Sequence, residues 1–392
     1  MKKVALVAYD LGQGDAQKLL RNTALALRAT GVEVRAIIKG ADQALQKELG
    51  ESKIEIASLG PKTHNSLDKA MEHEFLATSK KASKVLDDED VCLVIDEEAV
   101  MFSELKKGPA VFWSQGPFFL TAIQGKLQGY GSLTKKLFEL GVARCASRYS
   151  AHLKAYDGLI ANCNACAALL RYVAGRCPDA VIYPPVDPSL CANPEVATQG
   201  DHVLLLGDEK DPAFQQLAKA LGAVGKVEVV SLAGYKEKAY ELSSTYAQAS
   251  FTVVDDPLGL MPYAPLESML CGTPVLTYDH GGTAEIISGA ISVSNVKPAR
   301  LTPGYTGNTL FGETPGKMVK EKLEELPSAG WLAHTRHELE EEAKFLMTQG
   351  YPISLRKKVR EKALALSLEK TGPSLLALLE RATREANRKF ST

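Results

Sequence analysis

Apolar and polar positions along the chain predict an alternation of buried strands and amphipathic helices. Lys3 to Ala8 and Val32 to Ile38 are short apolar runs of the kind found in strands that are buried on both faces. Between them, Ala16 to Thr30 carries apolar residues at helical spacing, and Gly31 is a typical helix end. Strand, helix and strand in this order form a βαβ unit, so the sequence predicts a parallel sheet in an α/β fold.

The same alternation continues through two halves of the chain. In the first half, we expect further strands at Lys53–Ser58, Val91–Ile95, Ala110–Trp113 and Ala155–Ala161, and a last helix at Cys163–Ala174. In the second half, we expect strands at His202–Leu206, Val227–Ser231, Phe251–Val254, Val275–Thr277 and Ile291–Val293. Four helices are then expected, at Lys317–Leu326, Leu339–Met347, Ile353–Leu368 and, beyond a break at Gly372-Pro373, Ser374–Phe390.

The paired prolines Pro184 and Pro185 mark the boundary between the halves. They stiffen the chain and remove two backbone donors, as a crossing between domains would. A chain of 392 residues is also too long for one compact core. We therefore expect one domain at 1–187, a second at 188–372 and a terminal helix at 373–392.

Composition narrows the class of protein. Hydrophobic residues make up 45% and charged residues 24%, which is typical of a globular protein, and the net charge of −1 gives no sign of nucleic-acid binding. No apolar run approaches the roughly 20 residues that span a bilayer, and the N-terminal apolar run is too short for a secretory signal. The seven cysteines are odd in number and loosely spaced, so we expect reduced thiols and a cytoplasmic location.

Two short polar motifs could hold a metal ion, but each has a simpler interpretation. Asp96-Glu97-Glu98 follows a predicted strand, and we interpret it as a solvated loop. Cys163 and Cys166 are spaced as C-x-x-C, but no second pair with ligand spacing follows. Their surroundings are rich in Ala and Leu, so buried small residues are expected, and no metal site is predicted.

The stretch from Pro265 to Glu285, PLESMLCGTPVLTYDHGGTAE, carries the main functional signal. It predicts a helix ended by Gly272 and Pro274, a short strand, and a glycine turn that leads into another helix. The carboxylate of Glu267 and this turn flank one strand, which suits a ligand with hydroxyls at one end and phosphates at the other. An ordinary αβ turn with helix-cap glycines would account for part of the pattern, but not for its full extent.

This stretch resembles the donor-sugar signature of family 4 glycosyltransferases, E-A-M-A-x-G-x-P-V followed by G-G-x-x-E. The matching segments are Glu267 to Val275 and Gly281 to Glu285. A second match is Ile182 to Asp187, which is similar to the I-x-P-x-V-D of that family's domain crossing. The resemblance implies a GT-B fold: two Rossmann-like α/β domains that face a cleft, the first for the acceptor and the second for the donor, with the terminal helix crossing back onto the first domain.

The resemblance also implies a role for each candidate residue. Glu267 would bind the ribose hydroxyls, and the amides of Gly281, Gly282 and Thr283 would stabilise the leaving diphosphate together with Lys210. Asp256 would contact the donor sugar, and Gln115, in the loop after a predicted strand, would face the transferred sugar. Gly12 and Gly14 would approach the donor phosphate or the acceptor, although G-x-G is also part of a dinucleotide fingerprint.

The implied reaction is the metal-independent, anomer-retaining transfer of a hexose-like sugar. The donor is a nucleotide sugar, which is a co-substrate rather than a cofactor, and the acceptor is a hydroxyl of a glycan or lipid-linked glycan. The region from Thr121 to Lys154 has a single acidic residue, Glu139, and six basic residues, namely Lys126, Lys135, Lys136, Arg144, Arg148 and Lys154. The segment 126–154 is therefore either a solvated surface or a peripheral contact with anionic lipid at the inner face of the membrane.

Three features depart from the family pattern. Asp208 stands where the family has an Arg, and a carboxylate there would repel the leaving diphosphate. The usual position of the first acid holds Gly259, so Asp256 can replace that acid only if three residues are inserted after its motif. The donor half also looks short by at least one βα unit.

These departures keep two other hypotheses open. A GT-B-shaped binding or scaffold subunit that has lost catalysis would tolerate Asp208 and the displaced acid. A sugar-nucleotide epimerase of the same fold has no residue of its own in its favour. No Ser/His/Asp arrangement offers a rival chemistry.

Overall fold

The computed structural model of the chain describes residues 1–11, 15–41, 43–58, 90–104, 108–116, 147–191, 200–231, 242–256, 259–260, 263–287 and 330–390. The chain forms two compact units. The first contains the described residues up to Tyr183 and those from Thr371 onward, and the second contains those from Pro184 to Lys370. The chain thus leaves the first unit between Tyr183 and Pro184, a few residues before the boundary that the sequence predicts, and returns to it between Lys370 and Thr371.

The first unit is built on a seven-stranded parallel sheet with the order β3-β2-β1-β4-β5-β6-β7. Its strands are β1 (Lys3–Leu11), β2 (Glu33–Ala41), β3 (Glu55–Ser58), β4 (Val91–Val94), β5 (Ala110–Ser114), β6 (Gly158–Ala161) and β7 (Ala180–Val181). Its helices are α1 (Asp15–Ala29), α2 (Gln43–Glu51), the 3₁₀ helix η1 (Glu97–Glu104), residues 147–155, α7 (Asn164–Ala174) and most of α16 (Leu368–Phe390).

The second unit is built on a five-stranded parallel sheet with the order β12-β11-β10-β8-β9. Its strands are β8 (His202–Gly207), β9 (Val227–Ser231), β10 (Ala249–Val254), β11 (Val275–Tyr278) and β12 (Gly330–Ala333). Its helices are η2 (Pro188–Cys191), α8 (Pro212–Gly222), α9 (Leu242–Gln248), α10 (Tyr263–Leu270), α11 (Gly281–Ile287), α14 (Arg336–Gln349) and α15 (Ser354–Leu364).

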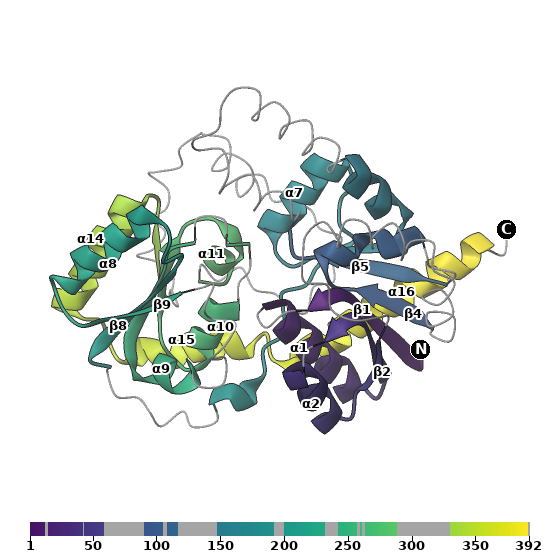
Figure 1. The fold of residues 1–392 in the computed structure, drawn as a ribbon, viewed down its shortest axis with the longest axis horizontal. Helices are drawn as coiled ribbons and strands as arrows, with labels where there is room; N and C mark the ends of the chain where they lie inside the picture. The colour runs from purple at the N-terminus through teal and green to yellow at the C-terminus, as the bar shows by residue number, and fades with distance from the viewer. Residues whose placement is uncertain are drawn as a thin grey trace. The chain divides into compact units, whose positions relative to one another are not determined.

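Apolar side chains on both faces of the central strands explain why the sheets are parallel and covered. Every residue of β4, β5, β6, β8 and β11 is buried, as expected of strands with helices on both sides. In the second unit, Phe214 and Leu217 of α8 and Leu339 of α14 pack on Val203 and Leu205 of β8. Figure 1 shows α8 and α14 on one face of this sheet and α9, α10 and α15 on the other. The α/β prediction is confirmed for both units.

The C-terminal helix differs from the prediction at its start. The sequence predicts a break at Gly372-Pro373, whereas α16 runs through both residues. A side chain at Gly372 would lie 2.3 Å from the carbonyl oxygen of Ala26, so glycine allows α16 to pack closely on α1. Further along α16, Arg381 donates to the carbonyl of Asp179, also in the first unit. The helix therefore does return to the first unit (Figure 1), but without the predicted break.

The edge of the second sheet also differs from the prediction. Strand β12 pairs with β11 from Gly330 to Ala333, a strand that sequence patterning missed because it is short and half exposed. The strand predicted at 291–293 and the helix predicted at 317–326 lie outside the described residues. In both sheets the strand order reverses beside the first strand, between β1 and β4 and between β8 and β10. Ligands of open α/β sheets bind outside the carboxyl ends of the strands at such points.

Candidate functional site

The signature stretch of the second unit folds as α10, β11 and α11. All eight residues of α10, including Glu267, and all seven residues of α11 are buried. Gly272 has a φ of +77°, and the amide of Thr273 donates to the carbonyl of Ser268, which ends α10 in the manner the sequence predicts. Glu267 is only 5% exposed, which places its carboxylate inside the unit rather than on an open surface.

The glycines of the signature lie against a segment about 20 residues earlier in the chain. The amide of Gly282 donates to the carbonyl of Leu260 at 2.5 Å. Gly281 has a φ of +83°, and a side chain there would come within 2.3 Å of the carbonyl oxygen of Gly259. The glycine turn, which the structure makes the first turn of α11 rather than a loop before it, therefore packs directly on the segment that follows Asp256. Because the Gly282 amide is used by Leu260, this conformation does not offer it to a diphosphate.

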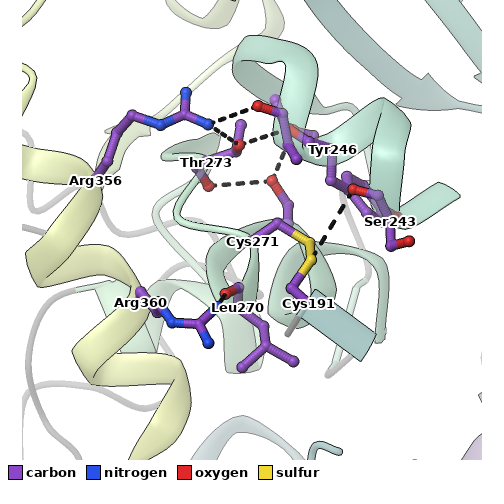
Figure 2. The surroundings of a disulfide bond; sticks show 11 residues. Cys191, Ser243, Tyr246, Leu270, Cys271, Thr273, Arg356 and Arg360 are labelled. Carbon is purple, nitrogen blue, oxygen red and sulfur yellow. Dashed lines mark hydrogen bonds between the residues drawn. A yellow bond between two sulfur atoms is a disulfide. The ribbon is translucent and has the colours of Figure 1, made fainter. Parts of the chain in front are cut away.

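The end of α10 is tied to the elements around it (Figure 2). Arg356 of α15 is buried and donates to the carbonyls of Ala247 and Ala249 and to the Thr273 hydroxyl, each at 2.9 Å. Arg360 donates to the carbonyl of Leu270 at 2.5 Å. Charged donors at the last carbonyls of a helix stabilise its C-terminus. These contacts hold the helix that carries Glu267 in a fixed position on the sheet.

A disulfide joins Cys191 of η2 to Cys271 at the end of α10, with Cα atoms 5.3 Å apart (Figure 2). The prediction of reduced thiols is therefore wrong for these two cysteines. The sequence could not reveal the pair because 80 positions separate them. Among the described residues, Cys92, Cys163, Cys166 and Cys177 take no part in a disulfide.

The turn after β8 carries Asp208, the residue that departs from the resemblance at this position. Asp208 is exposed, and its carboxylate accepts a bond of 2.9 Å from the amide of Lys210. Asp211 caps the N-terminus of α8 by accepting from the amide of Ala213. Lys210 is exposed on the same turn. With the exposed Glu209, the turn therefore brings one cation and three carboxylates to the carboxyl end of β8.

Arg336 connects this turn to the end of β10. Its Nη2 lies 2.8 Å from Asp211 Oδ2 and 2.9 Å from Asp255 Oδ2, and its Nε donates to Asp255 Oδ1 at 3.1 Å. The hydroxyl of Tyr278 also donates to Asp255 Oδ1, at 2.5 Å. Burial, followed by the bond to Asp255, raises the pKa of Tyr278, so the phenol keeps its proton. The charge of Arg336 is thus shared between two carboxylates at the reversal point of the sheet.

The loop after β5 in the first unit carries Gln115. Its side-chain Oε1 accepts from Asn162 Nδ2 at 3.2 Å, and its Nε2 donates to the carbonyl of Trp113 at 3.3 Å. The backbone of the loop is bonded to Glu97, because Gln115 and Gly116 donate their amides to Glu97 Oε1 at 2.6 and 3.0 Å. Asn162 follows β6, so all three side chains lie at the carboxyl edge of the sheet.

Glu97 is buried, so its interpretation as part of a solvated loop is wrong. Besides the two amides, it accepts from the hydroxyls of Ser114 and Tyr149, each at 2.5 Å. Burial raises the pKa of Glu97 to about 7, although these four hydrogen bonds lower it. Sequence reasoning missed this residue because neighbouring acids usually indicate exposure, and nothing local distinguishes Glu97 from Asp96.

Several predicted residues fall outside the part of the chain that the structure describes. These are Gly12, Gly14 and, of the basic segment 126–154, everything before residue 147. Among the described candidates, Asp256 follows β10 and Thr283 is buried in α11. Cys163 caps α7 by accepting from the amide of Cys166 at 3.3 Å, in agreement with the structural interpretation of that pair. Within the described ranges, no group of three or more potential ligands could hold a metal ion, and no helix could cross a membrane.

Residues 186–302 match the model of a protein family described as glycosyl transferases group 1. The matched range includes the turn after β8, helix α10 and the glycine turn at the start of α11. No curated protein matches the sequence of the chain. The second unit therefore resembles this family in sequence.

Solved structures extend the likeness to the whole fold. Sucrose-phosphate synthase from Thermosynechococcus elongatus gives a TM-score of 0.63 at 14% identity, covering 100% of each chain. HepE from Anabaena, solved with UDP and glucose, gives 0.58 at 15% identity, covering 97% of this chain and 100% of that chain. A glycosyltransferase from Rickettsia africae gives 0.57 at 12% identity, covering 97% and 98%. The chain has the GT-B fold of these glycosyltransferases.

Proposed function

We propose that the protein is a glycosyltransferase that moves a sugar from a nucleotide-sugar donor to a hydroxyl acceptor. The observation that carries the proposal is the packing of the Gly281-Gly282 turn on Gly259 and Leu260 beside the helix of Glu267. The second part of the donor-sugar signature thus packs on the segment after Asp256 within one unit, and the group 1 family match covers both segments. Fold likeness alone would not support an activity.

Each candidate residue has a distinct role in this proposal. Glu267 accepts hydrogen bonds from the ribose hydroxyls of the donor, and Asp256 contacts the donor sugar. Lys210 and backbone amides of the glycine turn stabilise the charge that develops on the leaving diphosphate, and the Gly282 amide joins them only after it releases the Leu260 carbonyl. In the reaction, the bond between the anomeric carbon and the diphosphate oxygen breaks, a bond to the acceptor oxygen forms, and the acceptor hydroxyl loses its proton.

The finer features of the proposal follow from the family resemblance. We propose a hexose-like sugar, retention of the anomeric configuration, no metal requirement, and a glycan or lipid-linked glycan as acceptor. The binding of UDP and glucose by the similar HepE structure supports a nucleoside diphosphate and a hexose as the donor's components. A lipid-linked acceptor would give the basic segment 126–154 a role at a membrane surface in the cytoplasm.

A binding or scaffold subunit without catalysis is the second candidate. It is favoured by the carboxylates of Asp208, Asp211 and Asp255 at the carboxyl edge of the second sheet and by the use of Arg336 to balance two of them. A leaving diphosphate requires positive charge or free donors at this edge. The Gly282 amide, which could be such a donor, instead bonds to the Leu260 carbonyl.

Thermal-shift measurements with UDP, GDP, ADP, dTDP and CMP distinguish these candidates. A nucleotide at 100 times its Kd raises the free energy of unfolding by about 2.7 kcal/mol. We expect one diphosphate to raise the melting temperature of the parent and of Glu341→Gln, an exposed control in the same unit, but not of Glu267→Gln or Glu267→Ala. If no nucleotide changes the melting temperature of the folded parent, the scaffold candidate is favoured instead.

Activity measurements then test the finer features. Release of free nucleotide from the matching nucleotide sugar shows cleavage of the donor. The anomeric configuration of the product, read by NMR, tests retention. An unchanged rate in EDTA tests independence from metal ions, and an inverted product or a metal requirement would contradict the corresponding feature.

A further inference from the structure

Four hydrogen-bond donors converge on the buried carboxylate of Glu97. Ser114, Gln115 and Gly116, three consecutive residues at the end of β5, bond to Oε1, and Tyr149 bonds to Oε2. Gly116 has a φ of +116°, and its amide also lies 3.1 Å from the Ser114 hydroxyl. The carboxylate therefore fixes the direction in which the chain leaves the strand, at the residue where the turn begins.

Asn162 fixes the side chain of Gln115 in the same loop. Its Nδ2 donates both to the backbone carbonyl and to Oε1 of Gln115, at 3.3 and 3.2 Å. The Gln115 amide is thereby held from both ends, since its Nε2 donates to Trp113. A primary amide offers two hydrogens and an oxygen with two lone pairs, so one donor and one acceptor of Gln115 stay available. Asn162 is 1% exposed, and its Oδ1 has no hydrogen-bond partner among the residues that the structure describes.

We propose that Glu97 and Asn162 are positioning residues that hold Gln115 for contact with the sugar or its acceptor during transfer. Glu97 sets the backbone of the loop and Asn162 sets the orientation of the Gln115 amide. The inference rests on the proposed function for the role of Gln115. A buried carboxylate lowers the stability of a fold compared with an apolar residue of similar size. Holding Gln115 in a reactive position is a function that explains why a carboxylate stands here.

A double-mutant cycle separates positioning from a general structural role. The readout is the release of UDP from UDP-glucose, with UDP binding measured by titration. Misplacing Gln115 by about 1 Å would lower turnover about 100-fold. We expect Glu97→Met to lower turnover by that order while UDP affinity stays within about twofold, and Glu97→Gln, which restores one acceptor oxygen, to recover part of the loss.

The cycle is closed with Gln115→Ala. If Glu97 acts through Gln115, Glu97→Met causes no further loss of turnover in the Gln115→Ala background, and Asn162→Asp behaves in the same way. Losses that multiply in the double variants would overturn the proposal. Glu33→Gln, which changes an exposed carboxylate of the same unit, should retain the parent's turnover. If Glu97→Met does not fold, Glu97→Gln carries the cycle.

Amide hydrogen exchange tests the positioning without reference to activity. We expect the Gln115 and Gly116 amides to exchange slowly in the parent and in Glu33→Gln, and faster in Glu97→Gln. Equal protection in the parent and in Glu97→Gln would refute the inference even in an active enzyme. A parent protein that binds UDP but does not cleave UDP-glucose would contradict the proposed function alone. Amide hydrogen exchange would still decide whether Glu97 holds the loop.

Discussion

Cys191 and Cys271 lie 80 positions apart in the sequence and are joined by a disulfide, with Cα atoms 5.3 Å apart. The bond ties η2, just after the chain enters the second unit, to the end of the helix that carries Glu267. Cys271 is part of the signature itself. The bond therefore connects the donor-site helix of our proposal covalently to the start of its unit.

Reduction of this disulfide should destabilise the second unit. The chain-entropy model gives about 4 kcal/mol for a closed loop of 80 residues. We expect urea unfolding of the second unit to begin at lower urea with dithiothreitol, and Cys191→Ser to show the same decrease without it. Cys177→Ser, which removes an exposed free thiol, is the control. Alkylation of all seven cysteines in the untreated, unfolded protein would show that the bond does not form.

Glu97 should make the stability of the first unit fall as pH rises from about 4.5 to 7. Its pKa is about 7 in the folded protein and its ordinary value is 4.5, so in this range the folded protein keeps a proton that the unfolded chain releases. The difference corresponds to about 3 kcal/mol of unfolding free energy, lost between the two pKa values and constant above them. Burial, followed for Tyr149 by Glu97 itself, raises the pKa of Tyr149 and Tyr156 above 10, so neither titrates there.

The measurement is chemical unfolding of the parent and of Glu97→Gln across this pH range. The unfolding free energy of the parent minus that of Glu97→Gln should fall as pH rises, because glutamine carries no titratable proton. Glu33→Gln supplies the control for an exposed carboxylate. Parallel pH profiles of the parent and Glu97→Gln would show that Glu97 titrates normally.

Asp255 and Asp211 should differ in their contribution to stability although both bond Arg336. The Asp255 side chain is fully buried, whereas that of Asp211 is 36% exposed. Asp255→Asn removes, at a fully buried position, the negative charge that faces Arg336 and the Tyr278 hydroxyl, and we expect a loss of about 3 kcal/mol. Asp211→Asn should cost about 1 kcal/mol, because water replaces the carboxylate. Urea unfolding measures the loss of stability in both variants. Equal losses would show that burial of the carboxylate does not determine its contribution.

Gly281→Ala should disrupt the contact between the glycine turn and the segment after Asp256. A side chain there meets the Gly259 carbonyl oxygen at 2.3 Å, and a φ of +83° strains any residue with a Cβ. We expect a loss of at least about 2 kcal/mol in stability, together with loss of nucleotide binding. Gly222→Ala is the matched control, since nothing lies within 4 Å of the added methyl group. Binding that survives in Gly281→Ala would separate the turn from the donor site.

The periodicity of the sequence was sufficient to predict the layers of the fold. Apolar runs such as Val91 to Val94 and Val203 to Leu206 are buried on both faces, and this local pattern determines that the sheets are parallel. The ends of α1 and α7 were within one residue of the prediction, because Gly31 and Gly175 follow them. The break at Gly372-Pro373 was wrong, because packing on α1 outweighs the local preference of the two residues.

The sequence by itself determined the candidate residues, since Glu267, Gln115 and the Gly281-Gly282 turn were proposed from sequence motifs alone. Only the tertiary structure decided what each of them contacts. Arg336 meets Asp255 across 81 positions, Tyr149 meets Glu97 across 52, and Cys191 meets Cys271 across 80. The order of strands in a sheet brings such residues together, and hydrophobic periodicity contains no information about that order. For the same reason Glu97 looked solvated in the sequence, whereas neighbouring strands enclose it in the fold.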